Sequence, residues 1–192
     1  MAMFTMSQAC QLYEAGNFQE AYAAFRHLIK DNPRDGRMHA MLAYLEIQVG
    51  GDLDEAEALI KKAETLDCPE GYYHRVRGEL TQKKGQHEEA VREYELSVAA
   101  EPSVSNLSAF AMALSDVGDK RSLSIWEKVL EKDAKNCKAL LYCGWEAENH
   151  KEFYKALGMA KLAEDLEPSN PAVLFAIGYI YNSLKWYQQA LK

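Results

Sequence analysis

Two stretches of the chain, 16–33 and 85–102, carry a glycine, a small residue, an aromatic residue and a proline at the same four offsets. The shared residues are Gly16, Ala21, Phe25 and Pro33 in the first stretch, and Gly85, Ala90, Tyr94 and Pro102 in the second. Within the second stretch, Ala90, Tyr94 and Ser97 lie at i, i+4 and i+7, which is one face of an α-helix. Each glycine is therefore predicted to precede a helix that buries a stripe of small and aromatic side chains.

The small residue of this pattern recurs along the whole chain. It falls at Ala21, Ala56, Ala90, Ser122, Ala156 and Ala190, with spacings of 35, 34, 32, 34 and 34 residues. A fixed period in the thirties indicates an array of repeated units, each packed on its neighbours. No alternation of period two, as expected for strands, competes with this pattern.

Each unit is predicted to contain two helices. In residues 71–104 the first helix ends at Gly85, whose free backbone suits a tight turn, and the second ends before Pro102. All the prolines fall at the expected boundaries between units, namely Pro33, Pro69, Pro102, Pro168 and Pro171. Between units, we expect bulky side chains such as Phe25, Ile60, Tyr94 and Trp126 to fill the core.

The pattern resembles the tetratricopeptide repeat, a 34-residue helix–turn–helix unit with the signature L-G-x-x-Y, then A-x-x-x-F, then P. The matching residues are Leu42-Ala43, Gly78, Gly144, Ile177-Gly178 with Tyr181, Ala21 with Phe25, Ala90 with Tyr94, and the prolines. The resemblance implies an all-α fold, a right-handed superhelical solenoid of antiparallel helix pairs. It covers residues 1–192 as a single array, with units at about 2–35, 36–70, 71–103, 104–136, 137–170 and 171–192, the last truncated.

Several units depart from the pattern. The second has an extra residue near Gly50-Gly51, and the fourth is about two residues short, with Ser122 and Ala134 at the small-residue and proline positions. Lys151 and Lys185 stand where glycine is usual. We expect the first helix of the sixth unit at 171–184 and the sequence to stop one turn into the second. We therefore expect the natural chain to continue, or another molecule to cap this end.

Helix geometry separates two faces of each first helix. Positions 4, 7, 8 and 11 of a unit face the second helix, whereas positions 2, 5, 9 and 12 lie roughly 130° away. The resemblance implies that this second set lines a concave groove that binds extended or helical peptides. Our candidate groove residues are Tyr44, Arg75, Glu79, Met112, Leu141, Trp145, Phe175 and Tyr179. The last four and Met112 would form an apolar shelf; alternatively, Trp145 packs on neighbouring first helices as core.

Composition narrows the functional class. The chain is 48% hydrophobic and 27% charged, with a net charge of −7 and no basic stripe, so we expect no nucleic-acid partner. No apolar run approaches the ~18 residues of a membrane span, and the N-terminus shows no signal-peptide pattern. Cys10, Cys68, Cys137 and Cys143 form no C-x-x-C pair, which favours free thiols over a metal site. We therefore expect a cytoplasmic protein without membrane insertion.

No catalytic motif is present. The sequence lacks phosphate-binding glycine loops, the G-x-S-x-G elbow and the H-E-x-x-H zinc motif. The histidines, His27, His39, His74, His87 and His150, are dispersed among the units. We predict no enzyme activity, no catalytic residues and no cofactor.

The leading hypothesis is a protein–protein interaction scaffold or adaptor that binds a partner peptide or helix through apolar and aromatic anchors. One alternative is a regulatory or targeting region of a larger protein, with an enzyme or anchor beyond residue 192. Another is self-assembly as a homo-oligomer through the C-terminal end near Trp186 and Tyr187.

Some tetratricopeptide proteins clamp the C-terminal carboxylates of chaperones. The matching positions here, Met6, Cys10, Met41, Tyr72 and Val76, carry no positive charge, so we predict no such clamp.

Overall fold

The structure, a computed structural model, describes residues 4–190, with the backbone alone for residues 186, 187, 189 and 190. Eleven α-helices and no strand are found in this part of the chain, which confirms the predicted all-α class. The chain divides into two compact units, Met1–Val117 and Gly118–Lys192. This division falls within the fourth predicted repeat, so the single array with its six boundaries stays a prediction. Each unit is described by itself.

The first unit is a succession of helices in which each helix packs on the next. Its helices are α1 (Met6–Glu14), α2 (Phe18–Leu28), α3 (Gly36–Gln48), α4 (Leu53–Glu64), α5 (Glu70–Lys83), α6 (His87–Ala100) and α7 (Val104–Asp116). Alternate helices also touch, because α3 contacts α5 and α5 contacts α7. The first helices of successive pairs therefore lie side by side, as they do in a helical repeat.

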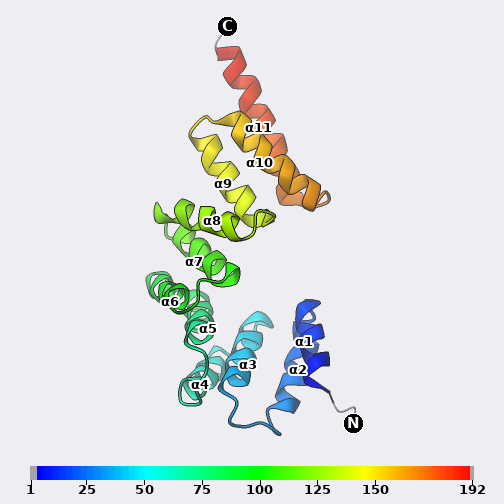
Figure 1. The fold of residues 1–192 in the computed structure, drawn as a ribbon, viewed down its shortest axis with the longest axis vertical. Helices are drawn as coiled ribbons and strands as arrows, with labels where there is room; N and C mark the ends of the chain where they lie inside the picture. Colours follow the sequence, from blue (N-terminus) through cyan, green and yellow to red (C-terminus); the bar gives the residue numbers. More distant parts are fainter. Residues whose placement is uncertain (1–3, 191–192) are drawn as a thin grey trace. The chain divides into compact units, whose positions relative to one another are not determined.

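The second unit follows the same plan with four helices. They are α8 (Arg121–Lys132), α9 (Cys137–Asn149), α10 (Phe153–Leu166) and α11 (Pro171–Ala190). Here α10 packs against both α9 and α11, and α9 also contacts α11, so these three helices form one layered group (Figure 1). This arrangement brings α9 and α11 together as neighbouring first helices.

Small residues allow the two helices of a pair to approach closely. Ala156, Ala160 and Ala163 of α10 are each at most 2% exposed, and they pack with Leu140 and Ala147 of α9 in one core cluster. The bulky residues expected between units are also buried: Phe25, Ile60, Tyr94 and Trp126 are all at most 3% exposed. The predicted helical stripes are therefore the core-forming faces.

Residues with positive φ mark the turns inside the helix pairs. Gly16, Gly50, Gly85 and Gly118 have φ between 68° and 76°, a region that glycine enters without steric cost. Lys151 occupies the matching place in the next pair with a φ of 63°. A lysine therefore adopts this unfavourable backbone conformation where the packing of α10 on α9 demands the turn.

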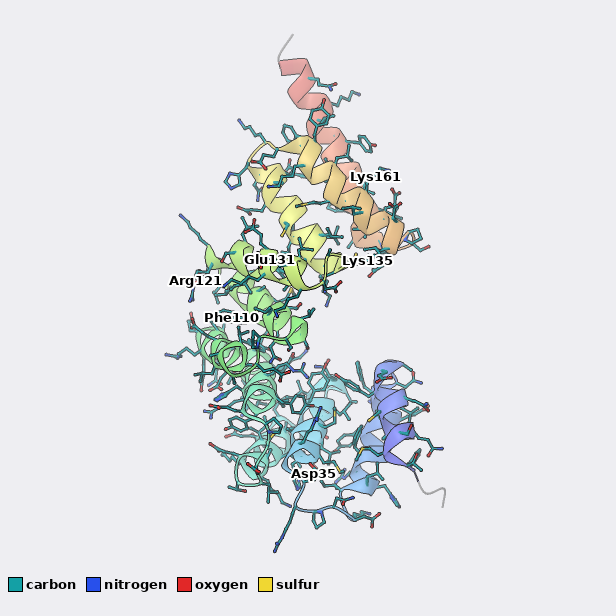
Figure 2. All side chains as sticks on the ribbon, viewed as in Figure 1. Asp35, Phe110, Arg121, Glu131, Lys135 and Lys161 are labelled. Atoms are coloured by element: carbon teal, nitrogen blue, oxygen red, sulfur yellow. The ribbon has the colours of Figure 1, made fainter. Side chains whose placement is uncertain are left out.

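Several first helices begin with a capping side chain. Thr5, Asp35, Ser103 and Asn136 accept a hydrogen bond from a backbone N–H in the first turn of α1, α3, α7 and α9, respectively. Asp35, labelled in Figure 2, accepts at 2.9 Å from the amide of Met38. Such caps satisfy backbone donors that would otherwise lack a partner at the start of a helix. They fix where these four helices begin.

The expected break after residue 184 is wrong, because α11 continues without interruption from Pro171 to Ala190. Lys185 lies inside this helix, although it occupies the same place in its unit as Lys151. Lysine favours the helical conformation, which Lys185 adopts. On α11, Leu174 and Tyr181 are 49% and 48% exposed, whereas Leu140 and Ala147 at the same positions of α9 are buried.

We predict that Gly78→Ala destabilises the protein and that Gly178→Ala does not. A Cβ on Gly78 would lie 2.7 Å from Cε1 of the buried Tyr94, so the ring must move, at a cost of about 1–3 kcal/mol. A Cβ on Gly178 would meet no atom within 4 Å, and alanine favours a helix by about 1 kcal/mol over glycine. Chemical unfolding followed by circular dichroism measures both changes; an equal response of the two variants would contradict this packing.

A second pair of substitutions tests the turn. Lys151→Gly should stabilise the protein by about 1 kcal/mol, because glycine removes the steric cost of the left-handed backbone. Lys185→Gly should destabilise it by a similar amount, since this position lies inside α11. Both lysines are exposed, so loss of the side chain itself has little effect. The same sign of change in both variants, measured by thermal unfolding, would refute the difference between the two positions.

Candidate functional site

Large aromatic side chains are exposed where α9 and α11 lie side by side. Trp145 of α9 is 67% exposed, and Phe175 and Tyr179 of α11 are 74% and 51% exposed. The Phe175 and Tyr179 rings stack one turn apart, with centroids 6.3 Å apart and an interplanar angle of 19°. Single exposed apolar residues are common on protein surfaces and need no explanation. A group of exposed aromatic residues, in contrast, marks a site of contact with another molecule.

The exposure follows from how the two helices use their other faces. On α9, Leu140, Cys143 and Ala147 are each 4% exposed. On α11, Val173 and Ile177 are buried in the same core cluster as Ala156 and Ala160 of α10. Because these core stripes are occupied, the residues on the other side of each helix are left uncovered. The aromatic group is thus a direct consequence of the helix pairing.

A cavity of about 650 Å³ lies between these helices and is mainly apolar. We call it the α9–α11 groove. Its lining residues are Leu140, Leu141, Tyr142, Gly144, Trp145, Glu148, Ala160, Pro171, Ala172, Phe175, Ala176, Tyr179 and Ile180. This volume falls within the usual range of ligand-binding clefts. Four of the predicted site residues, Leu141, Trp145, Phe175 and Tyr179, therefore line one cavity.

The sequence left open whether Trp145 lines the groove or packs in the core. Its side chain is mostly exposed, whereas the core cluster of this unit contains Leu140 and Ala147 from the same helix. Leu141 differs from Trp145, because it is half-buried and packs against that core. Trp145 thus lies at the surface of the groove, and Leu141 forms part of its floor.

Several lining residues were missed by the sequence analysis. Tyr142 and Ala176 occupy position 6 of their units, between the predicted groove and core stripes, and Ile180 was assigned no role. Tyr142 is held by a stack on the buried Trp126, with ring centroids 4.8 Å apart and an angle of 12°. Trp126 and Tyr142 are 16 residues apart in the sequence and lie on different helices. The periodicity within one helix therefore could not reveal that their rings stack.

Glu148 is the charged residue in the groove lining. It lies one turn after Trp145 on α9 and is half-buried. Nearby acidic residues have partners: Glu146 lies 3.3 Å from Nε2 of His150, and Glu152 lies 3.2 Å from Nζ of Lys155. Among the described residues, no cationic side chain lies within ion-pair distance of Glu148. The groove therefore combines an apolar wall with one acidic residue, Glu148, which has no cationic partner in the described part of the chain.

The candidate residues of the first unit are packed together differently. The Arg75 guanidinium of α5 lies 5.2 Å from the ring centroids of both Tyr44 and Tyr72. The pKa of Tyr44 is raised to about 12, chiefly by burial and to a smaller extent by the neighbouring Tyr13 and Glu79. Tyr44, Arg75 and Glu79 thus belong to one half-buried polar and aromatic cluster.

Met112 is half-buried on α7 and belongs to the first unit. Its grouping with Trp145 in an apolar shelf stays a prediction. Of the residues at the chaperone-clamp positions, Val76 is fully buried, and the hydroxyl of Tyr72 donates to Sδ of Met41 at 3.4 Å. The absence of a clamp also stays a prediction.

Possible metal sites, membrane-spanning helices and reactive thiols are the remaining features to consider in the part of the chain that the structure describes. No group of His, Cys, Asp or Glu side chains there is arranged to hold a metal ion. None of the described helices combines the length and the apolar character that crossing a membrane requires. The four cysteines are free thiols, and burial raises the pKa of both Cys68 and Cys143 to about 11. These two thiols are thus poor nucleophiles at neutral pH.

A comparison with known protein families also finds the predicted repeat in this chain. Residues 12–80 match the sequence model of the tetratricopeptide repeat family. No curated protein matches the chain significantly. Proteins built from this repeat are generally non-enzymatic scaffolds for other proteins.

Solved structures show the same fold. PilF from Pseudomonas aeruginosa aligns with a TM-score of 0.73 and 15% identity, over 97% of this chain and 88% of its own. MamA aligns with a TM-score of 0.62 and 16% identity, over 86% and 97% of the two chains. YrrB, described as a TPR protein with an unusual peptide-binding site, aligns at 0.60 and 20%, over 89% of each. The tetratricopeptide repeat family is thus matched over residues 12–80, and these solved structures share the fold over 86–97% of this chain.

Proposed function

We propose that this protein is an interaction scaffold whose α9–α11 groove binds a peptide or helix of a partner protein. The observation that carries this proposal is the exposure of Trp145, Phe175 and Tyr179 around an apolar cavity of about 650 Å³. A monomeric protein has no structural need to leave such a group in water, because exposed apolar surface costs free energy. An apolar segment of a partner would cover it.

The chemistry of these residues suits a role as anchors. Tryptophan and tyrosine are enriched among the residues that dominate binding energy, since they bury a large area at little entropic cost. Phe175 and Tyr179 stack on each other, so they offer a ligand one continuous aromatic surface. The groove is thus prepared for side chains that insert between Trp145 and Phe175.

A further observation supports the proposal. The fold is shared with YrrB, which is described as a TPR protein with an unusual peptide-binding site, and an identity of 20% relates the folds. The four free thiols fit a reducing compartment, and we propose a cytoplasmic location on that basis.

We predict that Trp145→Ala weakens binding of groove peptides by about 2 kcal/mol, which is the loss expected for a central aromatic anchor. Peptides selected from a phage-displayed random library against the wild-type protein serve as the probe, and their affinities are measured by fluorescence polarisation. The melting temperature should change little, because the Trp145 side chain is 67% exposed. Phe175→Ala should weaken the same peptides.

Two controls make this experiment specific. Tyr154 of α10 is 74% exposed, the same fraction as Phe175, but it does not line the groove, so Tyr154→Ala should leave binding unchanged. Trp126→Ala should instead unfold the protein or lower its stability by about 3–5 kcal/mol, because Trp126 is only 1% exposed. Selected peptides that bind Trp145→Ala and wild type equally would rule out the groove as the binding site.

A further inference from the structure

We infer that the α9–α11 groove selects peptides that carry a lysine or arginine next to their apolar anchors, and that Glu148 makes this selection. This inference rests on the proposed function, because it concerns the occupant of the same groove. It adds a charge requirement that the apolar lining alone does not impose.

The placement of Glu148 is the first argument. Glu148 belongs to the cavity lining, one turn along α9 from Trp145, so a basic side chain next to the residue that covers Trp145 is within its reach. Glu148 is half-buried and has no cationic partner among the described residues, whereas Glu146 of the same helix is paired with His150. A ligand that covers the groove removes water from this carboxylate, which is costly unless the ligand supplies a donor or a positive charge.

The order of residues along α9 gives the ligand a direction. Lys138, Leu141, Trp145 and Glu148 follow one another on one face, with the lysine and the glutamate separated by about 15 Å along the helix axis. A ligand with its positive charge at the Glu148 end avoids Lys138 at the other. The net charge of −7 also favours the approach of basic segments.

The test uses the phage-displayed random library with wild-type protein, Glu148→Gln and Glu148→Lys. Wild type should select lysine or arginine at one fixed distance from an apolar residue, Glu148→Gln should lose this preference, and Glu148→Lys should replace it with aspartate or glutamate. Glu146→Gln is the matched control, and it should select the same peptides as wild type. Circular dichroism checks that each variant is folded.

A second measurement varies the peptide as well as the protein. In a wild-type-selected peptide, replacing the basic residue by glutamine should weaken binding about fivefold, and this difference should shrink at high salt. The same replacement should have no effect on binding to Glu148→Gln.

The outcomes separate the two proposals. Peptides that depend on Trp145 but show no charge preference, or the same preference with Glu148→Gln, would overturn the role of Glu148 and leave the peptide-binding function intact. A library that yields no peptide dependent on Trp145 would overturn both.

Discussion

The close contact between the two helices of each pair is the constraint on which the rest of the structure depends. In the second unit this contact is made by Ala156, Ala160 and Ala163 of α10, which carry side chains small enough for α9 to approach closely. A helix that buries one stripe in this way must leave another face uncovered, since its side chains are distributed around the axis. The exposed aromatic face of the groove is therefore set by the alanine contact on the opposite side.

The same contact decides the backbone conformation of the turns. Lys151 and Lys185 have the same side chain and the same place in successive units, yet Lys151 has a φ of 63° and Lys185 lies inside a helix. Local preference cannot produce this difference, because lysine favours the helical conformation at both sites. The difference arises because a whole helix packs back on α9 after Lys151, and its buried surface outweighs the local strain.

These cases show how much of the molecule the sequence was able to predict. The period of the small residues indicated the helix pairs, the turns at Gly16 and Gly85, and the burial of Phe25 and Tyr94, because each depends on spacing along one helix. The continuity of α11 and the inclusion of Tyr142 and Ala176 in the groove were missed. Both depend on the distance between different helices, which a pattern in the sequence does not contain. The same limit applied to Trp145. Its position in the unit predicted the side of α9 on which it lies, but its exposure also depended on where α11 packs.

The candidate residues of the two units differ in how much free energy they can contribute when a ligand binds. Tyr44 already stacks on Arg75, so a ligand that reaches Tyr44 must replace a contact that the folded protein makes for itself. Trp145 and Phe175 are mostly in contact with water, so covering them removes apolar surface from solvent without breaking any contact among protein groups. The net gain on binding is the difference between new and lost contacts. For this reason the groove of the second unit, and not the tyrosine and arginine cluster of the first, is the stronger candidate for an anchor site, in line with the apolar shelf that the sequence predicts around Trp145.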